Sequence, residues 1–320
     1  MIRIFTIASN TFTEVIRQPI YLIILATSMV LILLSPHFTL FAMLENNKII
    51  KDMSLATMFI TGVLLAAFSA SNVVYKEIEN RTILTILTKP VNKISFIIGK
   101  YLGLLTSLFV AEYLLTIVLL HVIRTDITEA AYSKSDYPVI IGYVSAIIFS
   151  LLMAAFANFF YEKPFISSTV VFALPIFSII FFALCLVGPD WRLQPIFTNL
   201  DTKILLAAFL IFLALMLLNG VATAISTRLS TFPTLLICFA VFLLGLFSDY
   251  VFGRHSQDNW FAFLCYSIIP NLQIYWIIDA IIENKKIPFD YICYVFYYTM
   301  LFLSAVLSLA VAFFETKETG

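Results

Sequence analysis

Residues 203–225 read KILLAAFLIFLALMLLNGVATAI, and the side chain of Lys203 is the one charge in the stretch. A helix needs about 20 mainly apolar residues to cross the roughly 30 Å hydrocarbon core of a bilayer, and this stretch is long enough. Its apolar side chains surround the helix on all sides, whereas a soluble helix keeps a polar face. We therefore predict a transmembrane helix here.

The same pattern recurs along the chain. We predict an all-α polytopic membrane protein with about eight transmembrane helices in a single domain, residues 1–320. Of all residues 62% are apolar and 12% charged, which excludes the soluble, disordered and nucleic-acid-binding classes. The predicted spans are residues 20–43, 53–75, 95–123, 138–160, 165–187, 203–225, 232–252 and 289–314.

Two further apolar segments are not predicted to span. Residues 1–18 place Phe5, Ala8, Phe12, Val15 and Ile16 at helical spacing opposite polar side chains, which predicts a helix lying in the membrane interface. In residues 253–287, Pro270-Asn271 divides the apolar run into halves of about 11 residues, which are too short to cross. We expect an outer re-entrant or surface hairpin; the alternative is a ninth span that would put the C-terminus outside.

The positions of Lys, Arg and Trp predict the orientation. Lys and Arg concentrate between residues 76 and 100, beside the second and third spans, and cytoplasmic loops are rich in these residues. Trp191, Trp260 and Trp276 then fall in outer segments, together with residues 124–137. We expect both termini in the cytoplasm, a location in the cytoplasmic (inner) membrane, and no cleavable signal peptide.

No motif for catalysis is present in the sequence. Its Gly-Lys pair is Gly99-Lys100, and Ile94 stands where the loop GxxxxGK[ST] needs its first glycine, so we expect no ATP hydrolysis by this chain. The four cysteines and three histidines have no metal-ligand spacing, so we expect no metal, cofactor or catalytic residue. His37 and His121 are expected to touch water at the interface; the alternative is that they meet near the outer face as metal ligands.

Glu112 is the clearest ionisable residue inside a predicted span. Such a residue is costly in lipid and is a candidate for function, here as the titrating group of an ion- or proton-coupled carrier. The alternative is a neutral carboxyl group that forms a hydrogen bond with a nearby Tyr, Thr or Ser. Nearer the start of the same span, Gly99-x-x-x-Gly103 is a spacing that allows two helices to approach closely.

The loop after the second span predicts a short amphipathic helix over residues 77–88. Ile83, Leu84 and Leu87 form its apolar stripe, acidic residues begin it, and Lys89-Pro90 ends it. A rigid helix on the cytoplasmic surface, fixed by a span at each end, can transmit force from a bound partner. The alternative is a helix that only connects two spans.

Residues 77–103 read E-x-E-x-R-T-I-x-x-I-L-x-K-P-V-x-K-x-x-F-I-x-G-K-x-x-G. This run resembles the signature after the second span of ABC transporter permeases of the type-2 exporter class. The most similar branch contains permeases linked to copper-enzyme maturation and gliding. Residues 7–14, 226–230 and 270–272 also resemble parts of that class. The class commonly has six spans, and the pair 138–187 is additional here.

The resemblance implies a function for the chain. The chain would be the membrane subunit of an ATP-driven transporter, specifically an exporter. It would form a dimer with a second copy of itself or with a paralogue. A separate ATP-binding subunit would hold ATP and Mg²⁺ and dock on residues 77–88. The alternatives are the carrier that uses Glu112 and a non-transporting scaffold or assembly factor. The implied docking residues are Glu77, Glu79, Arg81, Thr82, Ile83, Leu84, Leu87, Lys89 and Pro90.

Overall fold

The computed structural model describes residues 2–38, 46–79, 92–132, 136–195, 200–255, 259–283 and 285–318. These residues form helices and their connections, with one isolated β-bridge between Val187 and Leu193, which confirms the all-α class. The helices are α1 (Ile2–Ile16), α2 (Pro19–Phe38), α3 (Asn46–Ala70), the π-helix η2 (Ser71–Tyr75), α4 (Lys76–Glu79), α6 (Lys93–Tyr132), α7 (Tyr137–Tyr161), α8 (Phe165–Leu186), α9 (Lys203–Ser226), α10 (Thr231–Leu246), α11 (Ser248–Val251), η3 (Gly253–His255), α12 (Trp260–Ile268), η4 (Gln273–Tyr275), α13 (Ile278–Ile282) and α14 (Phe289–Glu318).

The helices have the lengths that a polytopic membrane protein needs. Within the described ranges, seven helices are long and apolar enough to cross a bilayer, and up to nine spans result if each of two bent pairs counts as one. The predicted span 232–252 is one of these pairs, because α10 and the α11–η3 segment meet at 64°. The Gly245 carbonyl oxygen accepts a hydrogen bond from the N–H of Leu272 (2.9 Å) instead of one from the next turn of a continuing helix. The predicted span 232–252 is therefore bent after Leu246.

The chain divides into two compact units. The first consists of Met1–Val15, Gly62–Leu108 and Phe209–Gly320, and the second consists of Ile16–Thr61 and Phe109–Ala208. The division falls within α3, α6 and α9, so each unit combines segments that are distant in the sequence.

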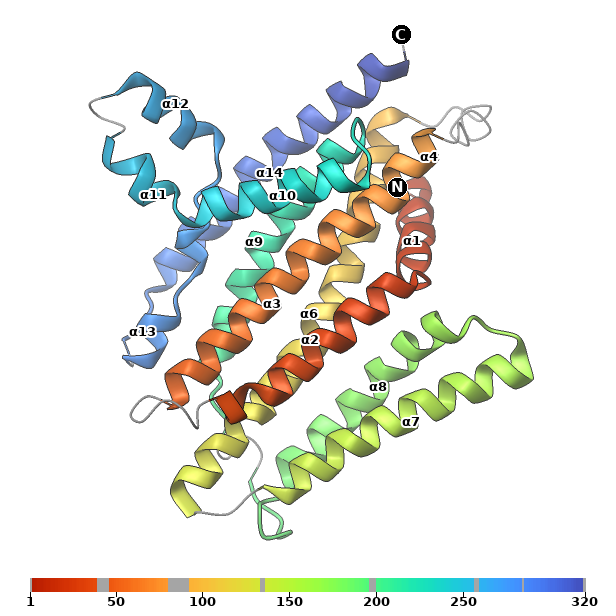
Figure 1. Ribbon diagram of the computed structural model, residues 1–320, viewed down its shortest axis with the longest axis vertical. Coiled ribbons are helices and arrows are strands. Elements are labelled where there is room, and N and C mark those ends of the chain that lie inside the picture. Colours follow the sequence, from red (N-terminus) through yellow and green to blue (C-terminus); the bar gives the residue numbers. More distant parts are fainter. Residues whose placement is uncertain are drawn as a thin grey trace. The chain divides into compact units, whose positions relative to one another are not determined.

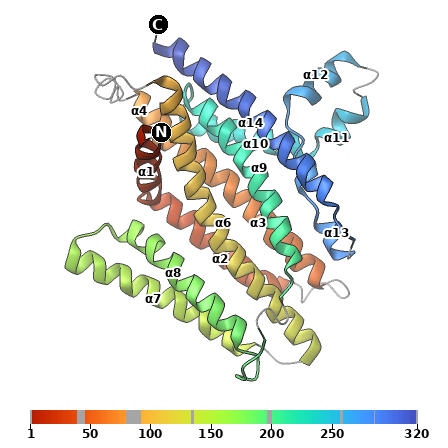
Figure 2. The same cartoon turned by 180° about the vertical axis from the view of Figure 1, so that it is seen from behind.

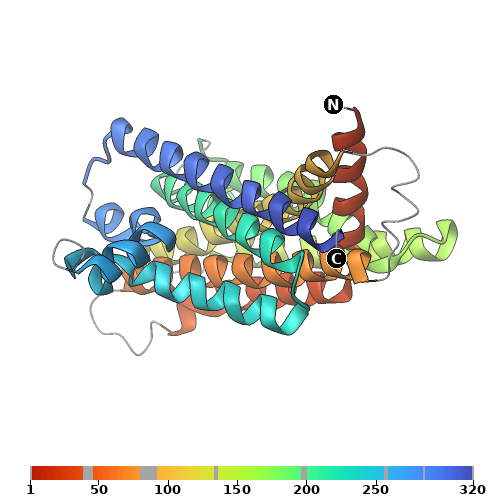
Figure 3. The same ribbon diagram turned by 90° about the horizontal axis from the view of Figure 1, so that it is seen from above.

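In the first unit, α9 and α14 pack closely (Figure 2). A Cβ atom on Gly220 would lie 2.8 Å from Cδ1 of Leu303, so glycine is what lets α14 approach. Phe96 of α6 stacks on Phe314 of α14, with 5.4 Å between ring centroids. Figure 3 shows α14, in dark blue, as one unbroken helix.

The broken segment after α11 is tied to α14 by side-chain hydrogen bonds. Helix α12 ends at Ile268, before the predicted break at Pro270. The Asn271 N–H then donates to the Tyr298 hydroxyl (2.9 Å), and the Tyr275 hydroxyl bonds Thr299 (2.8 Å). Non-helical backbone is tolerated at membrane depth where such partners satisfy it.

In the second unit, α7 and α8 form an antiparallel hairpin over the predicted spans 138–160 and 165–187 (Figure 1). Small buried residues on α7, including Ala146, Ser150 and Ala154, allow close packing. The hairpin turns at Glu162, which adopts the left-handed conformation with φ of 53°.

Helix α1 forms over the predicted interfacial segment, and part of its surface is buried by protein contacts. Phe5, expected on the apolar face, is 76% exposed, whereas Thr11 is completely buried. The reason is the neighbour of α1: its Ile7, Ala8 and Thr11 lie against two glycines of α6.

Candidate functional site

The structure describes the start of the predicted coupling helix. Helix α4 includes Glu77 and the exposed Glu79, and the Tyr75 hydroxyl donates a long hydrogen bond to Glu79 Oε1 (3.4 Å). The other implied docking residues lie outside the described residues: Arg81, Thr82, Ile83, Leu84, Leu87, Lys89 and Pro90.

A π-helical turn leads into this segment. Residues Ser71–Tyr75 join α3 to α4, and the flanking Ala70 and Lys76 both have right-handed helical backbone. The Ser71 hydroxyl donates to Thr231 Oγ1 (2.8 Å), which ties this turn to α10. Single π-turns inside α-helices are rare and are frequent at functional sites.

Lys100 of α6 brings three elements of the first unit together. It is 4% exposed, and its Nζ lies 2.6 Å from Glu77 Oε1 of α4 and 3.7 Å from Glu14 Oε2 of α1. The ammonium also lies 5.7 Å from the centroid of the Phe96 ring, within cation–π range. Glu77 is therefore engaged inside the protein, in addition to any role on the surface.

The two carboxylates are not equivalent partners. Burial raises the pKa of Glu14, and this effect exceeds the opposing influence of Lys100. Glu14 is also the more exposed of the two, with 43% of its side chain accessible against 24% for Glu77. Glu77 is thus the principal partner of Lys100.

The spacing Gly99-x-x-x-Gly103 is the contact site of α1. A Cβ atom on Gly99 would lie 2.8 Å from Cβ of Ile7, and one on Gly103 would lie 2.5 Å from the backbone oxygen of Ala8. Both distances are shorter than a real Cβ contact allows, so larger residues would push α1 away. The close helix approach predicted from this spacing is confirmed.

Glu112 lacks the hydrogen bond that one of the two predicted alternatives requires. Its two carboxylate oxygens are buried and have no hydrogen-bond partner among the described residues. Thr116 donates to the backbone oxygen of Glu112 (2.7 Å), and the Tyr113 hydroxyl pairs with Ser178 instead. The expected bond from a nearby Tyr, Thr or Ser is therefore wrong.

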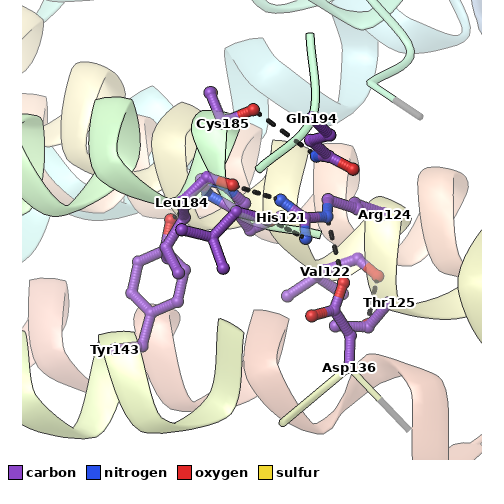
Figure 4. A network of polar contacts seen from close by, with 10 residues as sticks. His121, Val122, Arg124, Thr125, Asp136, Tyr143, Leu184, Cys185 and Gln194 are labelled. Atoms are coloured by element: carbon purple, nitrogen blue, oxygen red, sulfur yellow. Dashed lines mark hydrogen bonds and ion pairs between the residues drawn. The ribbon is translucent and has the colours of Figure 1, made fainter. Parts of the chain in front are cut away.

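A second buried network lies in the second unit, around Arg124 (Figure 4). Its guanidinium donates to the carbonyl oxygens of Leu184 (2.5 Å) and Val187 (2.7 Å), at the C-terminal end of α8. Its Nε lies 3.0 Å from Asp136 Oδ2, just before α7, and both side chains are completely buried. Arg124 thus ties both neighbouring ends of the α7–α8 hairpin to α6.

His121 belongs to the same network. Its Nδ1 lies 2.6 Å from the Tyr143 hydroxyl, which donates to the Ile117 carbonyl (2.9 Å), so Nδ1–H is the donor in the first bond. The ring also makes an edge contact with Phe181, at 4.9 Å between centroids. His121 is completely buried, so its expected contact with water is wrong; the side chain of His37 lies outside the described residues.

Sequence reasoning missed these networks because it assigned their charges to loops. Arg124 falls in the predicted outer segment 124–137, and Lys51 precedes the predicted span 53–75, yet α6 continues to Tyr132 and α3 begins at Asn46. Lys51 is buried and pairs with Asp201 at 2.6 Å. The available signal was the short distance of each charge from an apolar run, because α-helices commonly extend beyond their apolar part.

Among the residues that the structure describes, no group of three His, Cys, Asp or Glu side chains is placed to hold a metal ion. No family model, curated protein or solved structure matches this chain. Its function must therefore be inferred from its own residues.

Proposed function

We propose that this chain is the membrane subunit of an ATP-driven transporter of the ABC class, and specifically of an exporter. It acts as a dimer with a second copy or a paralogue, and residues 77–88 dock a separate ATP-binding subunit. The warrant for the class is the resemblance of residues 77–103 to the type-2 exporter signature.

The observation that supports this function best is the ion pair between Glu77 and Lys100. These residues lie near the two ends of the resembling run, residues 77–103, one on α4 and one on α6. A surface segment transmits force into the membrane only if its ends are attached firmly to the helices there. A pair at 2.6 Å with a buried lysine provides such an attachment, because removing Glu77 would leave the buried ammonium without its nearest counter-charge.

A proton- or ion-coupled carrier is the second candidate, and Glu112 supports it. A carboxyl group buried without a hydrogen bond is costly, so its retention in the chain calls for a purpose. A scaffold or assembly factor has no particular observation in its favour.

Purification from native membranes tests the proposal. The chain should retain an ATP-binding subunit in mild detergent, and the complex should hydrolyse ATP at a rate that the isolated chain does not reach. Robust turnover by the single chain, or the absence of any nucleotide-binding partner under several mild conditions, would contradict the assignment. Proton uptake by vesicles that hold the chain alone would favour the carrier.

A further inference from the structure

We propose that Lys100 is a positioning residue that holds α1, α4 and α6 as one block, so that the docked ATP-binding subunit moves all three together. This inference rests on the proposed function for its mechanical meaning. Its structural part, the joining of α1 and α4 to α6, stands independently of any partner.

The chemistry of lysine suits this role. An ammonium group has three donors and no acceptor, so it can bind two carboxylates from different elements at the same time. Lys100 donates a hydrogen bond to Glu77 of α4 at 2.6 Å and lies at ion-pair distance, 3.7 Å, from Glu14 of α1. The burial of the ammonium raises the strength of each interaction, because the surroundings screen charge less than water does.

Close backbone packing supports the same block beside the charges. Gly99 precedes Lys100 directly, and Gly103 follows about one turn later; both admit α1 to within contact distance of α6. Movement of α6 therefore carries α1 with it at two levels of the helix.

The block also continues into the membrane-spanning helices of the first unit. Phe96, which lies below the Lys100 ammonium, packs in one apolar cluster with Ala224 of α9 and with Val306, Ala310 and Phe314 of α14. Ile78 of α4 packs against this cluster as well. A displacement of α4 thus has a direct path to α9 and α14.

The alternative is that Lys100 contributes only stability. Lys51 supplies a matched control, since it is also a buried lysine with a carboxylate 2.6 Å away, on Asp201 of the other unit. Lys51→Met should cost stability of a similar kind without loosening α1 or α4. Lys100→Met should loosen both.

Two reporter cysteines measure the loosening in the full-length chain. In a background free of the four native cysteines, Ile78→Cys reports on α4 and Thr11→Cys reports on α1, because both positions are shielded by packing. Modification by a hydrophilic maleimide is timed in open membrane fragments. Lys100→Met should accelerate both reporters by about fivefold or more, the effect of a modest loss of interaction energy on an equilibrium.

Further variants separate charge from shape. Lys100→Arg should keep both reporters near the parent rate, and the exchange Glu77→Lys with Lys100→Glu should restore the α4 reporter alone, since Glu14 then faces a like charge. Glu77→Gln should accelerate mainly the maleimide modification of the α4 reporter. If Lys100→Met does not insert into the membrane, Glu77→Gln takes its place as the variant that tests the proposal. Unchanged rates in Lys100→Met, or in Glu77→Gln where that variant decides, overturn the proposal. Equal acceleration in Lys51→Met also overturns it.

A second arm uses the complex with its co-purified ATP-binding subunit. Lys100→Met should still bind the subunit but lose the stimulation of ATP turnover that the parent and Lys51→Met retain. If the parent chain binds no such subunit, the proposed function fails while the maleimide rates still decide whether Lys100 positions the block. Full stimulation in Lys100→Met would overturn the mechanical part of the inference.

Discussion

Single charged residues decide how the second unit is held together. Arg124 is completely buried, donates hydrogen bonds to two carbonyl groups at the end of α8, and supplies the counter-charge of the Asp136 carboxylate. The last carbonyls of a helix have no hydrogen-bond partner within the helix, so a cation there is favourable for two reasons. It donates hydrogen bonds to these carbonyls, and its charge complements the negative end of the helix dipole. The hairpin therefore depends on one side chain that the sequence places outside the apolar run.

Arg124→Met should lower the free energy of unfolding by about 3–5 kcal/mol, because Asp136 is then left buried without its counter-charge. The double variant Arg124→Met with Asp136→Leu should regain part of this loss. The measurement is thermal unfolding in detergent, followed with a thiol-reactive dye on the buried Cys185 and Cys238. Arg192→Met, at an exposed arginine, is the control and should change stability by less than about 0.5 kcal/mol. A loss of that small size in Arg124→Met would contradict the role given to this network.

Glu112→Gln should leave both stability and ATP turnover of the complex close to the parent values. The substitution keeps the size of the side chain, and it breaks no hydrogen bond, since neither carboxylate oxygen has a partner among the described residues. Turnover and, in sealed vesicles, pH-driven transport are the measurements. Loss of pH-driven transport in a well-folded variant would favour the carrier.

At the scale of elements, the segment after the second span is joined to its neighbours more firmly than its amphipathic pattern indicates. The π-turn η2 forms a hydrogen bond with α10, and α4 forms an ion pair with α6. Two glycines of α6 are in close contact with α1. The consequence concerns the design of experiments on docking. A Glu77→Lys variant would place a second lysine beside Lys100, so an effect on partner binding could arise inside the chain.

Leu84→Asp and Glu79→Lys should therefore be used to test docking. Leu84→Asp should abolish co-purification of the ATP-binding subunit if this leucine fills a pocket on it, as apolar anchors at interfaces commonly do. Glu79→Lys should weaken binding less, since single exposed ion pairs contribute about 1 kcal/mol or less. The amount of co-purified subunit and its ATP turnover are measured after membrane insertion has been verified. Parent-like assembly in both variants would reduce residues 77–88 to a connector.

At the scale of the whole molecule, the helices have the length and apolar character of a polytopic membrane protein. The predicted orientation rests on the lysine and arginine residues between 76 and 100 and on the three tryptophans. The two bent pairs make the total number of spans depend on whether each pair crosses or returns. The side on which residues 253–287 emerge is therefore the most informative single observation.

Cysteines introduced at Asn80 and Ser256 should label differently in intact cells. An impermeant maleimide added outside should modify Ser256→Cys and spare Asn80→Cys, because the loop after the second span is predicted to face the cytoplasm. Labelling after permeabilisation controls for accessibility. The reverse pattern would invert the assigned orientation.

The sequence by itself determined which segments are helical and apolar enough to span, where the helix before Pro270 ends, and where two glycines admit another helix. Each of these depends on local composition or on spacing along a single helix. Only the tertiary structure decided which carboxylates Lys100 and Arg124 meet, which strip of α1 is buried, and that the span after Thr231 bends after Leu246. The physical reason is that a buried charge or a free carbonyl group takes its partner from whichever helix lies beside it, and adjacency between helices is not encoded in the hydropathy of either one.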